Sequence, residues 1–146
     1  MTATRAQVVA EARRWLGTPW VHQHRECGVA VDCVGLVIGV ARALGLVPPS
    51  FDFNGYSRRP DGTLLAVCDM HMQRIQRAQM RPGDVLVVAV ERDPQHMGIV
   101  GDYAGGRLSL IHACGPRTGH GRVVEHRLVW TPRMQFRAAY ALPGVG

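Results

Sequence analysis

One cysteine and two histidines have the residue types and the order along the chain that nucleophilic catalysis needs. Cys33 stands at the start of an apolar run, and His96 and His112 belong to two later runs that are rich in β-branched residues. A cysteine nucleophile needs a base that takes its proton, and the base needs a third group that holds its ring. We therefore predict Cys33 as nucleophile, His96 as base and His112 as the group that orients the base.

The sequence around Cys33 predicts that the thiol lies at a helix N-terminus. Asp32 is a good N-cap residue, because its carboxylate accepts a hydrogen bond from a first-turn N–H, and Gly45 is a natural stop. The unpaired N–H groups and the dipole at a helix N-terminus favour the thiolate form of a cysteine. The apolar residues that follow recur at helical spacing: Leu36, Val37, Val40 and Leu44.

The remaining elements predict an α+β fold in one domain that covers residues 1–146. A Thr4–Gln7 capping box precedes a helix that we expect to reach Leu16 and to end at Gly17, and a short helix is expected from Thr63 to about Met70. Helices come first and strands last, which favours an antiparallel sheet. Five strands are expected, at residues 85–90, 96–101, 108–113, 123–126 and 136–140.

The two histidines belong to strands that we expect to be neighbours. His96 opens one strand and His112 stands near the end of the next, and the turn at Gly105-Gly106 is short enough to form a hairpin. Neighbouring strands bring such side chains together on one face. His71, His120 and His126 are given no role.

Composition excludes several other classes of protein. The apolar fraction of 47% and the charged fraction of 19% are those of a globular protein, and no apolar stretch is long enough for a membrane span. The net charge of +6 comes entirely from arginine, but the basic residues are scattered, so we expect no nucleic-acid partner.

The N-terminus does not resemble a signal peptide, so we expect synthesis in the cytoplasm. Cys68 and Cys114 are expected to be small core residues.

Five segments in order resemble the NlpC/p60 cell-wall cysteine peptidases, over about residues 5–141. The short Gly-Thr-Pro stretch followed by His22-Gln23-His24, and the run from Gly28 to Cys33, are most similar to the branch found in phage tails and gene-transfer agents. The five segments are Leu16–Trp20, Asp32–Leu36, Arg81–Val85, His96–Val100 and Leu110–Ala113.

This resemblance implies a papain-like fold, in which the nucleophile helix packs on a small antiparallel sheet. It implies hydrolysis of peptidoglycan stem peptides at the bond from the γ-carboxyl of D-glutamate to the diamino acid, with no cofactor and no metal. It implies Cys33, His96 and His112 as the catalytic residues, in the roles given above. It also implies delivery to the cell wall as part of a particle, with tail-tip or baseplate proteins as partners.

Three further residues are predicted to bind substrate, and two of them depart from the family pattern. Asp32 is expected to cap the helix and to meet the substrate amino group. Val34 replaces a serine that follows the cysteine in many members, and Trp20 replaces a tyrosine. These departures leave open a second reading, a tail-tip or baseplate subunit that has the fold but little activity. A third reading is a metal site made of His22, His24, Cys27 and Cys33.

Overall fold

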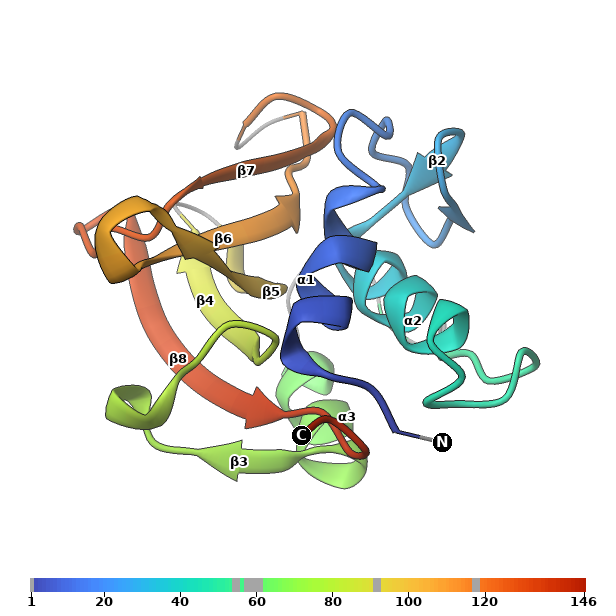
Figure 1. Ribbon diagram of the computed structural model, residues 1–146. Helices are drawn as coiled ribbons and strands as arrows, with labels where there is room; N and C mark the ends of the chain where they lie inside the picture. The colour runs from blue at the N-terminus through green and yellow to red at the C-terminus, as the bar shows by residue number, and fades with distance from the viewer. Residues whose placement is uncertain (1, 54–55, 57–61, 91–92, 117–118) are drawn as a thin grey trace.

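The computed structural model describes residues 2–53, 56, 62–90, 93–116 and 119–146 of the chain (Figure 1). Its helices are α1 (Arg5–Arg13), α2 (Cys33–Ala43) and α3 (Thr63–His71), with short 3-10 turns η1 (Arg77–Gln79) and η2 (Ala104–Gly106). Its strands are β1 (Arg25–Glu26), β2 (Ala30–Val31), β3 (Gln73–Ile75), β4 (Val85–Val90), β5 (Asp93–Tyr103), β6 (Arg107–Ala113), β7 (Val123–Arg127) and β8 (Met134–Ala141). Among the described residues, no helix has the length and the apolar character needed to cross a membrane.

The larger sheet has six strands in the order β3-β8-β4-β5-β6-β7, and every neighbouring pair is antiparallel. Helices α1 and α2 pack against it, and α2 contacts β5 and β6, as Figure 1 shows to the right of the sheet. The predicted α+β class with an antiparallel sheet is confirmed. A separate two-stranded hairpin, β1-β2, leads directly into α2.

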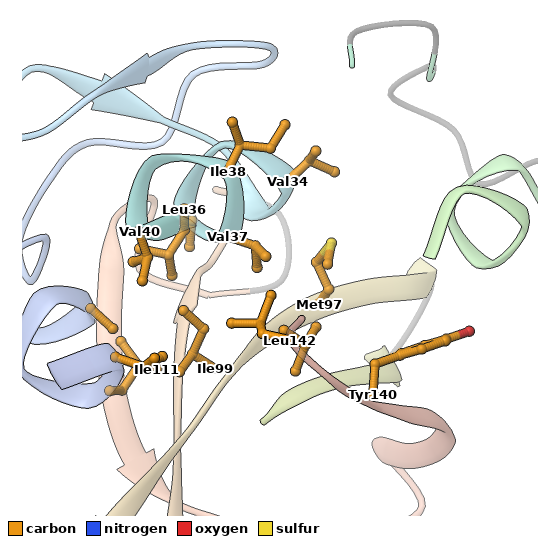
Figure 2. Packing of buried hydrophobic residues seen from close by; sticks show 14 of the residues in the cluster. Val34, Leu36, Val37, Ile38, Val40, Met97, Ile99, Ile111, Tyr140 and Leu142 are labelled. Carbon is orange, nitrogen blue, oxygen red and sulfur yellow. The ribbon is translucent and has the colours of Figure 1, made fainter. Parts of the chain in front are cut away.

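Alternation along the strands gives the sheet two apolar faces. The face covered by the helices holds the main core, in which Met97 and Ile99 on β5 pack with Val34 and Val37 on α2 (Figure 2). Figure 2 shows the Met97 side chain directed from β5 toward α2. The opposite face holds a second cluster of buried residues: Leu86, Val88, Val100, Leu110, Met134 and Ala139.

The N-terminal helix begins where the sequence predicts and ends earlier. The capping box is present, since the Thr4 side chain accepts from the Gln7 N–H and the Gln7 side chain accepts from the Thr4 N–H. The regular helix ends at Arg13, so the expectation that it reaches Leu16 is wrong. The chain leaves the helix in turns that bury Trp15 against α2 and leave Leu16 43% exposed.

Short strands account for most of the other differences from the sequence prediction. Strands β1, β2 and β3 have only two or three residues each, too few for an alternating pattern to be recognised. Strands β1 and β2 pair with each other in a local hairpin, whereas β3 forms because β8, far along the chain, lies beside it. Cys68 and Cys114 are both buried, as predicted, and all four cysteines are free thiols.

Candidate active site

The thiol of Cys33 belongs to the first residue of α2, as the sequence predicts. The preceding residue, Asp32, has extended backbone angles, and its carboxylate accepts the Gly35 N–H at 2.8 Å. The Asp32 carbonyl oxygen accepts the Leu36 N–H at 3.0 Å, which closes the first turn. Cys33 is half-buried against the main core, so its side chain is held at the positive end of the helix dipole.

Asp32 does more than cap the helix. Asp32 is 2% exposed, and its carboxylate also accepts from the Gln23 N–H at 2.7 Å, the Tyr56 hydroxyl at 2.7 Å and the Arg25 guanidinium at 2.9 Å. The structure thus uses both carboxylate oxygens to tie the loop before β1, and the segment at Tyr56, to the start of α2. The contact of Asp32 with a substrate amino group stays a prediction.

Arg25 links this carboxylate to a second one. Its guanidinium contacts Asp52 at 2.9 Å and also donates to the Tyr56 hydroxyl at 2.6 Å. Burial lowers the pKa of Arg25, but the charge of Asp32 and the bond to Asp52 outweigh it and raise the pKa above its usual value. Burial and the hydrogen bond to Asp32 raise the pKa of the Tyr56 phenol, so this hydroxyl remains a donor.

The loop before α2 lies directly on the first turn of the helix. A Cβ added at Gly35 would collide with the carbonyl oxygen of His24 and would lie 2.9 Å from the Arg25 guanidinium. Only glycine leaves room for this approach. Gly35 therefore lets the loop pack tightly beside the cysteine.

The two predicted catalytic histidines are in direct contact. His96 Nε2 lies 2.6 Å from His112 Nδ1, and the two side chains are 5% and 3% exposed. The rings meet edge to face, with centroids 4.9 Å apart. A Cβ added at Gly98 would lie 2.8 Å from the Cβ of His112, so the glycine of β5 leaves space for the His112 side chain.

Both histidines are neutral at neutral pH. Burial lowers the pKa of His96 to about 4, with a smaller contribution from His126. Burial and the neighbouring histidines also lower the pKa of His112 well below its ordinary value. A neutral imidazole has one N–H and one lone pair, so each ring can accept a proton.

The residues next to Cys33 and His96 share one cavity. Val34 and Met97 both line an apolar cavity of about 130 Å³, which lies between α2, α3 and β5. The α2 side of this cavity is lined from Val34 to Ala41. That the thiol and the imidazole react as a pair stays a proposal.

Trp20 and Val34 have different surroundings. Trp20 is half-buried against the main core. The centroid of its ring is 6.5 Å from that of His22, and the His22 ring lies edge-on to the Tyr56 ring. Val34 is 7% exposed and packs within the core. Binding of substrate by these two residues stays a prediction.

The residues of the third reading do not form a cluster. His24 Nδ1 lies 3.0 Å from the His22 carbonyl oxygen, and the Cys27 thiol donates to the carbonyl of Arg14 at 3.4 Å. Within the part of the chain that the structure describes, no group of three or more histidine, cysteine, aspartate or glutamate side chains is arranged to hold a metal ion.

Two residues at the site have no role in the sequence prediction. His126 lies 2.8 Å from His112, and Tyr56 bonds to Asp32. The alternation of side chains along β7 could have identified His126. Strand β7 pairs antiparallel with β6, and this pairing places His126 on the face of the sheet that carries His112. Tyr56 has no such signal, since it lies outside every helix and strand predicted from the sequence.

Solved structures of other proteins share this arrangement of helices and strands. The NlpC/p60 domain of the peptidoglycan hydrolase SagA superimposes with a TM-score of 0.63 at 22% identity, covering 96% of this chain and all of that domain. NlpC2 from Trichomonas vaginalis gives a TM-score of 0.65 at 18% identity over 97% of this chain. This chain has the NlpC/p60 fold. No protein-family model and no curated protein matches its sequence.

Two further solved structures are similar to this chain. A lipoprotein-like NLP/p60 protein from Staphylococcus aureus gives a TM-score of 0.60 at 18% identity over 94% of this chain. An N-acetylmuramoyl-L-alanine amidase from Bacteroides uniformis gives 0.54 at 13% identity over 94% of this chain and 98% of its own. The chain spans 47% of the Trichomonas protein and 41% of the Staphylococcus protein. The fold predicted from the sequence is confirmed.

Proposed function

We propose that the chain is a cysteine peptidase that hydrolyses the stem peptides of peptidoglycan. The observation that carries this proposal is the 2.6 Å contact between His96 and His112, on an NlpC/p60 fold whose helix α2 begins with Cys33. It is supported by the solved structures that are similar to this chain, which include a domain of a peptidoglycan hydrolase and an N-acetylmuramoyl-L-alanine amidase.

The geometry supports a two-step acyl transfer. His96 Nε2 is engaged with His112, so His96 Nδ1 is the ring atom that would take the proton of the Cys33 thiol. The thiolate attacks the amide carbonyl, and His96 returns the proton to the leaving amine as the C–N bond breaks. Water, deprotonated by His96, then cleaves the thioester and restores the thiol. The backbone N–H of Cys33 is a candidate donor to the oxyanion.

His96 becomes a positively charged imidazolium during this cycle, so its surroundings must stabilise that charge. Burial disfavours the imidazolium form and lowers the pKa of His96. A Cys33 thiolate beside the ring would favour the imidazolium by direct charge attraction. The proton would therefore move to His96 together with formation of the thiolate, and the two charges would exist as a pair.

The bond that we propose is the one from the γ-carboxyl of D-glutamate to the diamino acid. The competing bond is the amide between the lactyl group of the sugar and L-alanine, which is the bond named in the description of the Bacteroides relative. We further propose that the protein reaches the wall as a component of a phage-tail-like particle. This context has its support in the sequence resemblance around Gly28–Cys33.

The deciding experiment is digestion of purified peptidoglycan by wild-type protein and by Cys33→Ala. We expect the variant to release soluble fragments at least about a thousandfold more slowly, because removal of a nucleophile leaves only the background of binding and oxyanion stabilisation. Mass spectrometry of the fragments identifies the bond, since cleavage at D-glutamate leaves a free amino group on the diamino acid.

The matched control is Cys27→Ala, which removes an exposed thiol from the preceding loop. It should digest at the wild-type rate, and circular dichroism should give the same fold for both variants. Undiminished digestion by Cys33→Ala would contradict the proposal. A wild-type protein that releases nothing, yet binds a tail-tip or baseplate protein, would support the structural-subunit reading instead.

A further inference from the structure

A third imidazole extends the histidine pair to the surface of the sheet. His126 on β7 is exposed, and its Nε2 lies 2.8 Å from His112 Nε2. Its other ring nitrogen, Nδ1, lies 2.9 Å from the carbonyl oxygen of Arg127. The three histidines come from the adjacent strands β5, β6 and β7, and the His112 ring meets the rings of both His96 and His126 edge to face. We call His96, His112 and His126 the imidazole chain.

The backbone carbonyl at the outer end fixes the position of every proton in the imidazole chain. A carbonyl oxygen only accepts hydrogen bonds, so His126 Nδ1 must carry the N–H. In a neutral ring, His126 Nε2 then carries a lone pair, which accepts the hydrogen bond from the N–H of His112 Nε2. His112 Nδ1 in turn carries a lone pair, which accepts the hydrogen bond from the N–H of His96 Nε2. The remaining lone pair of the imidazole chain is on His96 Nδ1.

Among the residues that the structure describes, Cys114 and His120 also interact with the imidazole chain, and neither reverses this order. The Cys114 thiol lies 3.5 Å from His112 Nδ1, and burial raises its pKa, so it stays a neutral thiol that bonds only weakly. His120 interacts electrostatically with His112 and helps to keep that ring neutral. The direct N–H···N contacts of 2.6 and 2.8 Å are therefore the bonds that decide the tautomers.

We propose that His126, anchored by the Arg127 carbonyl, is a positioning residue that acts through His112 to hold the His96 lone pair at Nδ1. This inference rests on the proposed function, in which Nδ1 is the atom that takes the Cys33 proton. His126 touches no reacting atom. Its contribution is to select one of the two tautomers of His96, and only that tautomer has its basic nitrogen free of the contact to His112.

The first test reads the tautomers directly, by ¹⁵N NMR of the imidazole rings in the Cys33→Ala protein at neutral pH. This background removes the thiol, so that the chain alone sets the protonation. We expect N–H groups at His126 Nδ1, His112 Nε2 and His96 Nε2, with a lone pair at His96 Nδ1. A lone pair at His96 Nε2 would overturn the proposal without the need for any His126 variant.

The second test adds His126→Phe to the same background. Phenylalanine keeps a ring at this exposed position but cannot accept the His112 N–H, so we expect His112 and His96 to become mixtures of tautomers. His71→Phe is the matched control, because it makes the same change at an exposed histidine on α3 outside the chain, and it should leave His96 unchanged. Retention of a single His96 tautomer in His126→Phe would overturn the proposal.

The third test measures the rate at which iodoacetamide alkylates Cys33 in protein with the native thiol. We expect His126→Phe to lower the rate about fivefold, the size of effect that loss of one hydrogen bond supports. His126→Gln should recover most of this loss, because its amide oxygen can accept the His112 N–H. An equal loss in both variants would mean a structural role only and would overturn the proposal.

These readouts separate the inference from the proposed function. The NMR tautomers do not depend on peptidoglycan, so a wild-type protein that fails to digest the wall would contradict the proposed function alone. A protein that digests the wall, but whose His96 tautomer and alkylation rate are unaffected by His126→Phe, would contradict the inference alone.

Discussion

At the scale of single residues, Asp32 connects the candidate nucleophile to the loop that surrounds it. One carboxylate group caps α2 and accepts from Gln23, Arg25 and Tyr56 while it is 2% exposed. Gln23 has a φ of 60°, an uncommon value for a residue with a side chain, and its N–H bond to Asp32 helps to hold it there. Placement of the thiol therefore depends on the charge and on both oxygens of Asp32.

We expect Asp32→Asn to destabilise the protein more than its cap function suggests. Asparagine is a good cap, but one oxygen becomes an amide that cannot accept, and the ion pair with the buried Arg25 is lost. We expect the free energy of unfolding, measured with urea, to fall by about 2–3 kcal/mol. This is at or below the lower end of the cost of breaking a buried ion pair, because Arg25 keeps its ion pair with Asp52.

Asp52→Asn is the matched control for this prediction. It makes the same change in the other carboxylate that contacts Arg25, but the Asp52 side chain is 38% exposed. Exposed ion pairs contribute less, so its cost should stay below about 1 kcal/mol. Equal losses for the two variants would contradict the role given to Asp32.

At the scale of elements, the position of α2 depends on a close contact with the segment that follows α1. Gly39 on α2 faces the Trp15 ring, and a Cβ added there would collide with ring carbons. Trp15 is 4% exposed and belongs to the main core, which also contains Leu36 and Val40. A glycine in mid-helix, which lowers helix propensity, here allows the indole to approach the helix backbone.

We expect Gly39→Ala to lower the free energy of unfolding by about 1–3 kcal/mol, because overpacking outweighs the gain in helix propensity of ~1 kcal/mol. Urea unfolding measures this. In a double-mutant cycle with Trp15→Phe, the smaller ring should recover part of the loss, so that the two costs are less than additive. A Gly39→Ala protein that is more stable than wild type would contradict the packing argument.

At the scale of the whole molecule, the buried imidazoles make stability depend on pH. His96 has a pKa of about 4 in the folded protein against an ordinary value of 6.5, so below pH 6.5 the unfolded chain binds a proton that the folded chain does not. Stability then falls as the pH is lowered through this window and levels off near pH 4 as the folded state also takes up the proton. The lowered pKa of His112 acts in the same direction.

We expect the free energy of unfolding to fall by about 2 kcal/mol from His96 alone between about pH 7.5 and pH 5, as proton linkage requires for this shift. Denaturant unfolding at a series of pH values checks it. The window lies above the range in which Asp52 and Glu125, whose pKa values are lowered, take up protons. An unfolding free energy that stays constant across this window would contradict the buried neutral state of the histidines.

The sequence by itself determined the local elements and the order along the chain of the predicted nucleophile, base and orienting group. The Thr4 capping box, the Asp32 cap and the helical spacing after Cys33 involve residues within a few positions of one another, so their physics is readable from the chain. The hairpin that joins His96 to His112 is equally local, and their contact follows from the pairing of β5 with β6.

Only the tertiary structure decided which distant groups complete this arrangement. The contact of His126 with His112 depends on the register between β6 and β7, which are separated by a long connection that carries no register signal. Tyr56 reaches Asp32 from 24 positions away, and Gly39 receives the ring of Trp15 from the segment that follows α1. Each of these contacts is set by how elements pack, because the residues involved have no local interaction that would place them.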